Sequence, residues 1–225
     1  MTTSNRQLAY LDLMGVQVWQ ERSRQEQVIA EEVSDDVTAN TLQELYEIAS
    51  NCQRCEASAV RNQLVFSDGP MHADWLIVGD FPTQQDDSEG RPLTGDVAHL
   101  LSEMLLAVGV KKSTVHLTNS VKCRSANVEA EKVELLSCRA YLIRQIELVK
   151  PQLVFVLGEK AAQSLLKSNE SLSQLTGTVH KVDDVPTPIV VSCHPRYLLK
   201  TPLAKRQAWD DIQLARTLVS KVDAS

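Results

Sequence analysis

Four short apolar runs recur along the chain, and amphipathic stretches separate them. The runs are 73–78 (ADWLIV), 115–118 (VHLT), 153–157 (LVFVL) and 189–192 (IVVS). Each run is too short for a helix and is rich in β-branched residues, which is typical of a strand buried on both faces. The pattern therefore predicts four strands of one sheet.

Apolar residues at helical spacing occupy the segments between these runs. One such pattern begins at Thr41, a second covers residues 100–108, and a third covers residues 135–149 before Pro151 ends it. Strands that alternate with helices favour a parallel sheet with helices on both faces. We therefore expect an α/β fold of three layers, α/β/α, around a central, mostly parallel four-stranded sheet.

The first forty residues differ from the rest, because a small apolar cluster is followed by a polar, charged run that ends near Asn40. Such a segment is too short to form its own core. We interpret residues 1–40 as a peptide arm with an acidic linker, and residues 41–225 as the α/β domain. The arm would fold onto a partner or pack back on the domain. The positions expected to contact a partner are Leu11, Val16, Val18 and Trp19.

Acidic side chains are concentrated close to this arm. Residues 20–47 contain eight acidic and two basic side chains, a difference of −6 that equals the formal net charge of the whole chain. The remainder is balanced, so we do not expect the protein to coat nucleic acid, although local basic groups can still contact phosphate. No stretch approaches a membrane span and no apolar signal segment opens the sequence, which predicts a cytoplasmic protein without a membrane partner.

Four cysteines on separated segments can enclose one metal centre. Cys52 and Cys55 form a C-x2-C pair, and Cys123 and Cys138 follow far downstream. Disulfides are the competing interpretation, but they are rare in cytosolic proteins. Zinc and an iron–sulfur cluster both accept four cysteines. Zinc sites usually use two close pairs, and no second pair surrounds Cys123, so a cluster is preferred.

Polar residues follow three of the predicted strands, where ligands bind in parallel α/β sheets. Asp80 and Phe81 come after the first strand, Asn119 directly follows the second, and His194 and Arg196 follow the last. Each of these turns alone is more typical of a structural role, in which polar side chains form hydrogen bonds with the backbone of a loop. Their joint placement at strand ends favours a binding site.

Residues 45–215 resemble the iron–sulfur uracil-DNA glycosylases, called family 4. The motifs that carry the resemblance are the C-x2-C pair, the Gly-acid-x-Pro turn at 79–82, Gly90-Arg91-Pro92, TNSVKCR at 118–124, Cys138, LVFVLGEKAAQSLL at 153–166 and HPRYLLKTP at 194–202. The resemblance implies a [4Fe–4S] cluster and leaves Cys193 outside its ligand set. The implied ligands are Cys52, Cys55, Cys123 and Cys138.

The same resemblance implies a site for excising uracil from DNA. Asn119 matches the asparagine that recognises the base, and His194 matches the histidine near the uracil oxygen. Asp80 replaces a longer acid, Phe81 a tiny residue, and Leu93 the phenylalanine that stacks on uracil, a contact worth about 1–3 kcal/mol. These departures predict a degenerate, inactive pocket. An active uracil-DNA glycosylase of base excision repair is the alternative.

Basic residues near this site are candidate DNA contacts, since the His-Pro loop of the resembling enzymes probes the duplex. We expect Arg196 to bind substrate, and a solvated basic face is the alternative. The basic residues are Lys122, Arg124, Arg196, Lys200, Lys205 and Arg206.

Residues 6–23 (RQLAYLDLMGVQVWQERS) resemble the amino-terminal peptide of the psi subunit of the bacterial DNA polymerase III clamp loader. The positions closest to its Leu-Gly-Ile-x-x-Trp-like pattern are Leu13, Gly15, Val16 and Trp19. This resemblance implies that the arm binds the clamp-loader ATPase subunits and that the α/β body holds the chi subunit, which contacts single-strand binding protein. Together the two resemblances predict a replisome connector on an inactive glycosylase scaffold rather than an enzyme.

Overall fold

The computed structural model describes residues 37–125 and 131–222, which all fall within the unit Val33–Ser225. Val37 and Ala39, at the end of the expected linker, are buried in the core of this unit, and Arg144 Nε donates to the Ala39 carbonyl at 2.7 Å. The expected partner contacts Leu11, Val16, Val18 and Trp19 lie outside the described residues. Their role stays a prediction.

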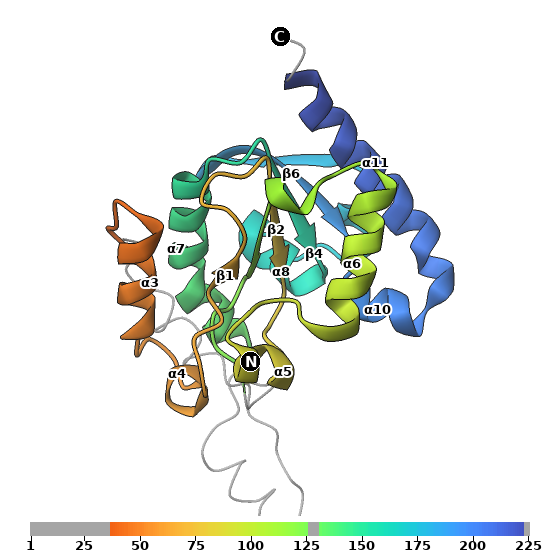
Figure 1. The fold of residues 1–225 in the computed structure, drawn as a ribbon. Coiled ribbons are helices and arrows are strands. Elements are labelled where there is room, and N and C mark those ends of the chain that lie inside the picture. Colours follow the sequence, from red (N-terminus) through yellow and green to blue (C-terminus); the bar gives the residue numbers. More distant parts are fainter. Residues whose placement is uncertain (1–36, 126–130, 223–225) are drawn as a thin grey trace, which may run out of the picture. The chain divides into compact units, whose positions relative to one another are not determined.

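A mixed sheet with the strand order β1-β3-β2-β4-β6-β5 forms the centre of the described body (Figure 1). Its strands are β1 (Ser67–Asp68), β2 (Trp75–Gly79), β3 (Val115–Asn119), β4 (Leu153–Leu157), β5 (Val179–Val182) and β6 (Val185–Ser192). Strands β3, β2, β4 and β6 are parallel to one another. Strands β1 and β5 pair antiparallel at the two edges.

The predicted four-stranded sheet is therefore wrong in its strand number, although all four predicted strands form its parallel centre. The two edge strands lack the apolar runs on which the prediction depended. Strand β1 has only two residues, and the residues of β5 alternate between exposed and half-buried. Strand β6 also begins four residues earlier than expected, because Pro186 and Pro188 obscured its first half.

Helices cover both faces of the sheet, with α3 and α7 on one side and α6 and α11 on the other (Figure 1). The α-helices are α3 (Leu42–Ser50), α4 (Ala57–Val60), α5 (Gln84–Glu89), α6 (Gly95–Ala107), α7 (Glu131–Val149), α8 (Glu159–Leu166), α9 (Leu172–Leu175), α10 (Pro195–Lys200) and α11 (Lys205–Val222). The part of the chain that the structure describes also contains the 3-10 helices η1 (Lys112–Thr114) and η3 (Pro202–Ala204). Among the described residues, no helix combines the length and the apolar character needed to cross a membrane.

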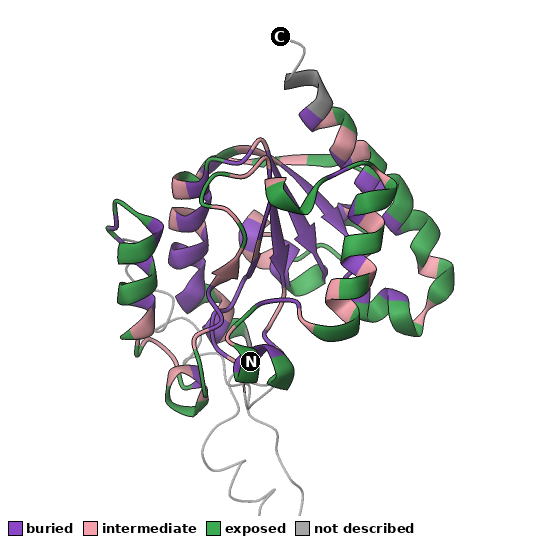
Figure 2. Ribbon diagram, viewed as in Figure 1, coloured by how far each residue is buried: buried purple, intermediate pink, exposed green. Residues whose placement is uncertain are grey.

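Successive residues of the central strands point into different helical layers. Leu76 and Val154 belong to a buried cluster shared with α3, α7 and α8. Their neighbours Ile77 and Phe155 belong to a second cluster shared with α6 and α11. Figure 2 shows the central strands as almost continuously buried, which is why they are apolar on both faces. The predicted three-layer arrangement is thus present in the described body.

The carboxyl ends of the parallel strands lie in register. Gly79 pairs with Asn119, and Leu157 pairs with Ser192. The turn after β3 packs on the turn after β2, since the Ser120 N–H donates to the Gly79 carbonyl at 2.8 Å. The polar turns singled out in the sequence therefore meet beyond the carboxyl ends of the parallel strands.

Candidate active site and cysteine centre

Asn119 ends β3 with an enclosed side chain. The residue is 1% exposed, and neither its amide nitrogen nor its amide oxygen has a hydrogen-bond partner within the described part of the chain. A buried amide without partners is unfavourable unless a ligand or water satisfies it. A Cβ added to Gly79 would lie 2.4 Å from Asn119 Oδ1, so glycine at this position leaves the space that the amide occupies.

Leu93 lies beside the same glycine. A Cβ on Gly79 would stand 2.8 Å from Leu93 Cδ2, so Leu93 and the Asn119 amide flank one point of the β2 backbone. Leu93 is buried and has a φ of 54°, a conformation that is strained for a branched side chain. The structure thus places Leu93 next to the candidate base-recognition residue.

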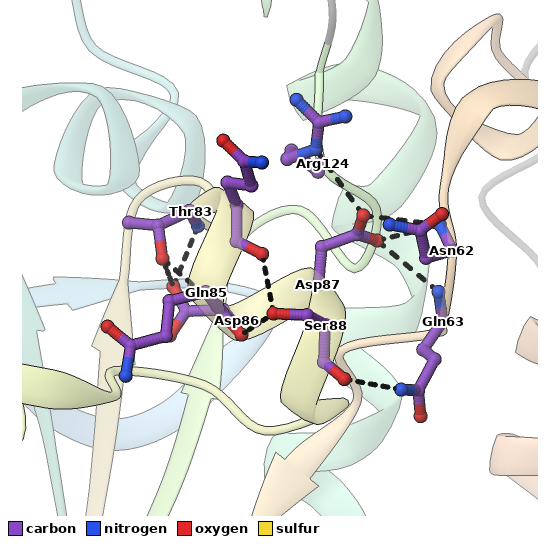
Figure 3. A network of polar contacts seen from close by, with 9 residues as sticks. Asn62, Gln63, Thr83, Gln85, Asp86, Asp87, Ser88 and Arg124 are labelled. Carbon is purple, nitrogen blue, oxygen red and sulfur yellow. Dashed lines mark hydrogen bonds and ion pairs between the residues drawn. The ribbon is translucent and has the colours of Figure 1, made fainter.

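Asp86 of α5 holds this strained loop in place. Its carboxylate accepts two hydrogen bonds from Thr83, at 2.7 and 2.8 Å, and two from Thr94, at 2.8 and 2.7 Å. Thr83 also caps α5 through a capping box with Asp86 (Figure 3). The buried carboxylate therefore ties the turn after β2 to the loop that carries Leu93.

The neighbouring Asp87 joins α5 to two other segments (Figure 3). Its carboxylate accepts from the backbone N–H groups of Asn62, at 3.0 Å, and Gln63, at 3.3 Å. Arg124 Nε lies 3.4 Å from the second oxygen. Because Arg124 directly follows Cys123, Asp87 connects the candidate active-site turn with the segment that carries a predicted cluster ligand.

His194 stands at the end of β6 and caps α10. The Arg196 N–H donates to His194 Nδ1 at 3.1 Å, which places the ring proton of the neutral form on Nε2. Burial, together with the charge of Arg196, lowers the pKa of His194 to about 4. Nε2 is buried and has no partner among the described residues. His194 is therefore a neutral ring with one N–H available to a ligand.

Asp80 follows β2 and reaches the amino terminus of α8. Its Oδ1 accepts from the Ala161 N–H at 2.9 Å, which satisfies a donor that the helix itself leaves unpaired. A Cβ on Gly158 would lie 2.3 Å from Asp80 Oδ2, so glycine permits the close approach. Burial raises the pKa of Asp80 from 3.8 to about 6, although the Ala161 N–H and the charges of Arg196 and Lys160 oppose the shift.

Phe81 directly follows Asp80 in the chain, and Arg196 belongs to α10. The Phe81 ring is half-buried, and Lys160 Nζ of α8 lies 5.9 Å from its centroid. Arg196 is exposed, and its charge acts on both Asp80 and His194. The structure therefore joins Asp80, Phe81, His194 and Arg196 in one neighbourhood.

The four predicted cluster ligands come from three segments: the α3–α4 connection, the turn after β3, and α7. Their thiols interact electrostatically, Cys55 with Cys123, Cys123 with Cys52, and Cys138 with both Cys55 and Cys123. Burial raises the pKa of Cys55 to about 11 and that of Cys138 to about 12. No three His, Cys, Asp or Glu side chains of the described residues are placed to hold a single metal ion.

Each of these four thiols also has a polar neighbour. The neighbours are Tyr141 for Cys52, the backbone of Ser58 and Ala57 for Cys55, Arg61 for Cys123 and the backbone of Lys122 for Cys138. Arg61 Nη1 lies 3.1 Å from Cys123 Sγ. Hydrogen bonds to cysteine sulfur are among the interactions by which proteins tune iron–sulfur clusters. The donor set therefore fits a cluster bound by four thiolates.

The structure contradicts the expectation that Lys122 contacts DNA. It was a candidate DNA contact, but it is 1% exposed, and burial lowers its pKa to about 7. A buried ammonium cannot reach a phosphate outside the protein. Nothing in the sequence marked this lysine as buried, because lysine is normally exposed.

The sequence analysis also missed Gly158 and Ser120. Gly158 has a φ of 103° and admits the Asp80 carboxylate, and its place directly after the predicted strand 153–157 was the available signal. Ser120 is buried next to Asn119, and its hydroxyl has no partner among the described residues. A serine within a loop carries no comparable signal in the sequence.

Comparison with known proteins agrees with this geometry. The family model described as the uracil DNA glycosylase superfamily matches residues 66–213. A type-4 uracil-DNA glycosylase of Pyrobaculum aerophilum is 31% identical over 180 residues, which cover 77% of this chain and 92% of the relative. Those of Thermotoga maritima and Archaeoglobus fulgidus are each 28% identical, covering 80% and 76% of this chain and 98% and 89% of the relatives.

These relatives overturn the prediction of an inactive scaffold that serves as a replisome connector. Five type-4 uracil-DNA glycosylases are 28–31% identical to this chain over most of its length. Enzymes, rather than clamp-loader subunits, are thus what the main domain is similar to. The prediction failed because it weighed single replacements, such as Phe81 and Leu93, more heavily than the retained polar groups of Asn119 and His194.

Proposed function

Because the chain belongs to the uracil-DNA glycosylase superfamily and to its type-4 branch, we propose that it is an active enzyme that hydrolyses the N-glycosidic bond of deoxyuridine in DNA. The observation that carries the proposal is the buried Asn119 amide, whose donor and acceptor both lack partners among the described residues. The test is uracil excision by the purified, metal-loaded protein on single-stranded and duplex oligonucleotides, with thymine in place of uracil as the control.

Asn119 is assigned the recognition of the flipped base. A carboxamide offers one acceptor and two donors, so it can pair with both the N3–H and the O4 of uracil. Leu93 flanks the amide and would contact the face of the base. An apolar contact with Leu93 replaces aromatic stacking at that position, so excision by this chain would depend strongly on the amide.

His194 is assigned the stabilisation of the leaving group. As the C1′–N1 bond breaks, uracil departs with the bonding electron pair, and negative charge develops on the base and its O2. The Nε2–H of the neutral imidazole is buried and has no acceptor among the described residues, so it can donate to that oxygen. With a pKa of about 4, His194 would remain neutral throughout the physiological range and would not lose its role through protonation.

Asp80 is assigned the orientation of the attacking water. The water oxygen forms a bond to C1′ as N1 departs, and its proton passes to the carboxylate and then to solvent. A carboxyl with a pKa near the working pH is well suited to this task. In this chain burial supplies that shift, to about 6, while the Ala161 N–H fixes the orientation of the carboxylate.

The pH dependence of excision should therefore follow Asp80. The carboxyl is protonated below about pH 6 and ionised above it, so we expect the single-turnover rate to rise with pH through about 6. Asp80→Asn should lower the rate by about 10²–10⁴-fold and remove this rise. Rates measured on a uracil oligonucleotide from pH 4.5 to 8 would check both points.

A role for Asp80 limited to capping α8 makes a different prediction. Asp80→Asn would then lower the melting temperature while the excision rate of the folded protein and its pH profile stayed unchanged. His194 provides an internal control, because a pKa of about 4 keeps it neutral across the same range. An unchanged profile in the variant would remove Asp80 from the mechanism.

We also assign a [4Fe–4S] cluster to Cys52, Cys55, Cys123 and Cys138. The mutual electrostatic interaction of their thiols, the polar neighbours of all four sulfur atoms and the hydrogen bond from Arg61 to Cys123 support this assignment. When bound, such a cluster supplies covalent cross-links among the segments that carry its ligands. The chain's own Asp87 adds a polar link between the same segments and α5.

The DNA-binding surface is assigned to the region that follows His194. Helices α10, η3 and the start of α11 carry exposed basic and apolar side chains. Leu203 is 93% exposed and Tyr197 is 50% exposed, and both are suited to contact bases or sugars. The exposed basic residues of this region are Arg196, Lys200, Lys205 and Arg206.

Neutralising two of these charges should weaken DNA binding in a salt-dependent way. For Arg196→Gln combined with Lys200→Gln, we expect lower affinity for every DNA sequence. The slope of log K against the logarithm of the salt concentration should be smaller in magnitude by about 2, since each phosphate contact contributes about 1. Fluorescence anisotropy at several salt concentrations measures this slope. Lys111→Gln combined with Lys112→Gln is the matched control, because both lysines are exposed before the amino end of β3. Equal slopes for the two double variants would contradict the assignment.

A further inference from the structure

Lys122 lies at an unusual place for a lysine. It is 1% exposed and ranks among the largest fully buried side chains of the described residues. In the sequence it stands between the candidate base-recognition residue Asn119 and the candidate ligand Cys123. A charged group is buried only where hydrogen bonds and opposite charge compensate the loss of water. The neighbours of Lys122 therefore indicate what its charge does.

The ammonium group holds the backbone of Asn119. Lys122 Nζ donates to the Asn119 carbonyl at 2.7 Å, to Thr118 Oγ1 at 2.6 Å and to Gln145 Oε1 at 2.8 Å. These three bonds match the three donors of an ammonium group. Thr118 Oγ1 donates in turn to the Phe66 carbonyl at 2.8 Å. Nζ thus anchors the residue whose amide is assigned to the base.

The other end of Lys122 faces the cysteine centre. Lys122 directly precedes Cys123, and Gln145, which accepts from Nζ, lies on α7, the helix that also carries Cys138. The side-chain charge of Lys122 interacts with Cys138 and Cys123. The three oxygens around Nζ are neutral, so they solvate the charge without balancing it. Thiolates that bind a metal are anionic. The cysteine centre can therefore supply the opposite charge that a buried ammonium requires.

We propose that Lys122 is a positioning residue that couples the cysteine centre to base recognition by Asn119. The anionic thiolates stabilise the buried ammonium, and the ammonium fixes the Asn119 carbonyl and thereby the direction of its amide. The inference rests on the proposed function, since it concerns how Asn119 is held for uracil. It gives the cysteine centre an influence on the active site that does not require electron transfer.

Two substitutions at this position separate the charge from the hydrogen bond. Lys122→Met removes both and keeps a similar length, whereas Lys122→Gln removes the charge and keeps a donor. We expect Lys122→Met to lower single-turnover excision by about 10- to 100-fold, the effect of losing a hydrogen bond from a charged donor. Lys122→Gln should recover part of that loss. Lys111→Gln is the control, because it removes an exposed lysine charge before the amino end of β3, whereas Asn119 lies at the carboxyl end of that strand. Its excision should remain within a few-fold of the wild type.

Two further measurements do not depend on catalysis. The first is the affinity for a single-stranded oligonucleotide with one 2′-fluoroarabinouridine, which resists hydrolysis, compared with the same oligonucleotide carrying thymidine. The preference for uracil should fall about tenfold or more in Lys122→Met.

The second measurement is the midpoint reduction potential of the metal centre at matched iron content. It should become more negative in both Lys122 variants and stay unchanged in Lys111→Gln, because only the former lose a positive charge beside the thiolates.

The outcomes distinguish this inference from the proposed function. Excision and uracil preference within twofold of the wild type in both Lys122 variants would overturn the inference alone. A shifted potential together with unchanged excision would also overturn it, since the cysteine centre would then not act on Asn119. A wild type that neither excises nor prefers uracil would overturn the proposed function itself. If Lys122→Met fails to assemble the metal centre, Lys122→Gln carries the same test with a side chain that can still form hydrogen bonds.

Discussion

Replacing Asn119 by alanine is expected to lower uracil excision by about 10²–10³-fold, the usual effect of removing one preorganised polar group from an active site. The melting temperature should hardly change, because the amide has no hydrogen-bond partner among the described residues that the substitution could break. This combination of a large kinetic effect and a small stability effect is specific to a ligand-binding group. Single-turnover excision and thermal unfolding of the same preparations measure both quantities.

Two further substitutions serve as controls for Asn119. Asn62→Ala removes an exposed asparagine side chain whose backbone N–H contacts Asp87, and it should leave excision unchanged. Asn119→Asp keeps the size of the side chain but replaces its donor with a negative charge facing the developing uracil anion, so it should be at least as inactive as alanine. A fully active Asn119→Ala protein would remove Asn119 from the site.

Replacing Cys123 by serine is expected to remove the brown absorbance of the cluster and to destabilise the protein by roughly 3 kcal/mol or more, since a structural metal centre contributes directly to folding. For a domain of this size the melting temperature would fall by about 10 °C. The same change would leave Arg61 Nη1 without the thiolate that it contacts at 3.1 Å. Visible absorbance, iron content and thermal unfolding check these expectations.

Cys193→Ser is the matched control for the cluster assignment. Cys193 is also buried and close to the active site, but it packs with Leu198 and Ala208 rather than with the other cysteines. Its substitution should leave the absorbance and the iron content unchanged. A colourless wild type that binds zinc would contradict the iron–sulfur assignment, and loss of colour in Cys193→Ser would contradict the proposed ligand set.

Function was predicted less well than fold because it was inferred from local replacements. Phe81 was counted among the replacements that make the pocket degenerate, and the structure shows its ring half-buried, with Lys160 Nζ of α8 at 5.9 Å from its centroid. The contact of Leu93 with the base stays a prediction, and the structure adds that Leu93 is buried with a positive φ. The direction of a side chain depends on elements that are distant in the sequence, so the motif alone could not decide between a degenerate and a working pocket.

The sequence by itself determined the parallel centre of the sheet, the strand ends that carry the site, and the set of separated cysteines. A strand buried on both faces must be apolar at nearly every position, so its local pattern is sufficient to identify it. Edge strands β1 and β5 lack that requirement, and only pairing with β3 and β6 defined them. Tertiary structure alone decided that Asp80 meets α8 and that Lys122 is buried beneath Asn119. Burial and electrostatics depend on which distant segments converge, and no local pattern encodes that convergence.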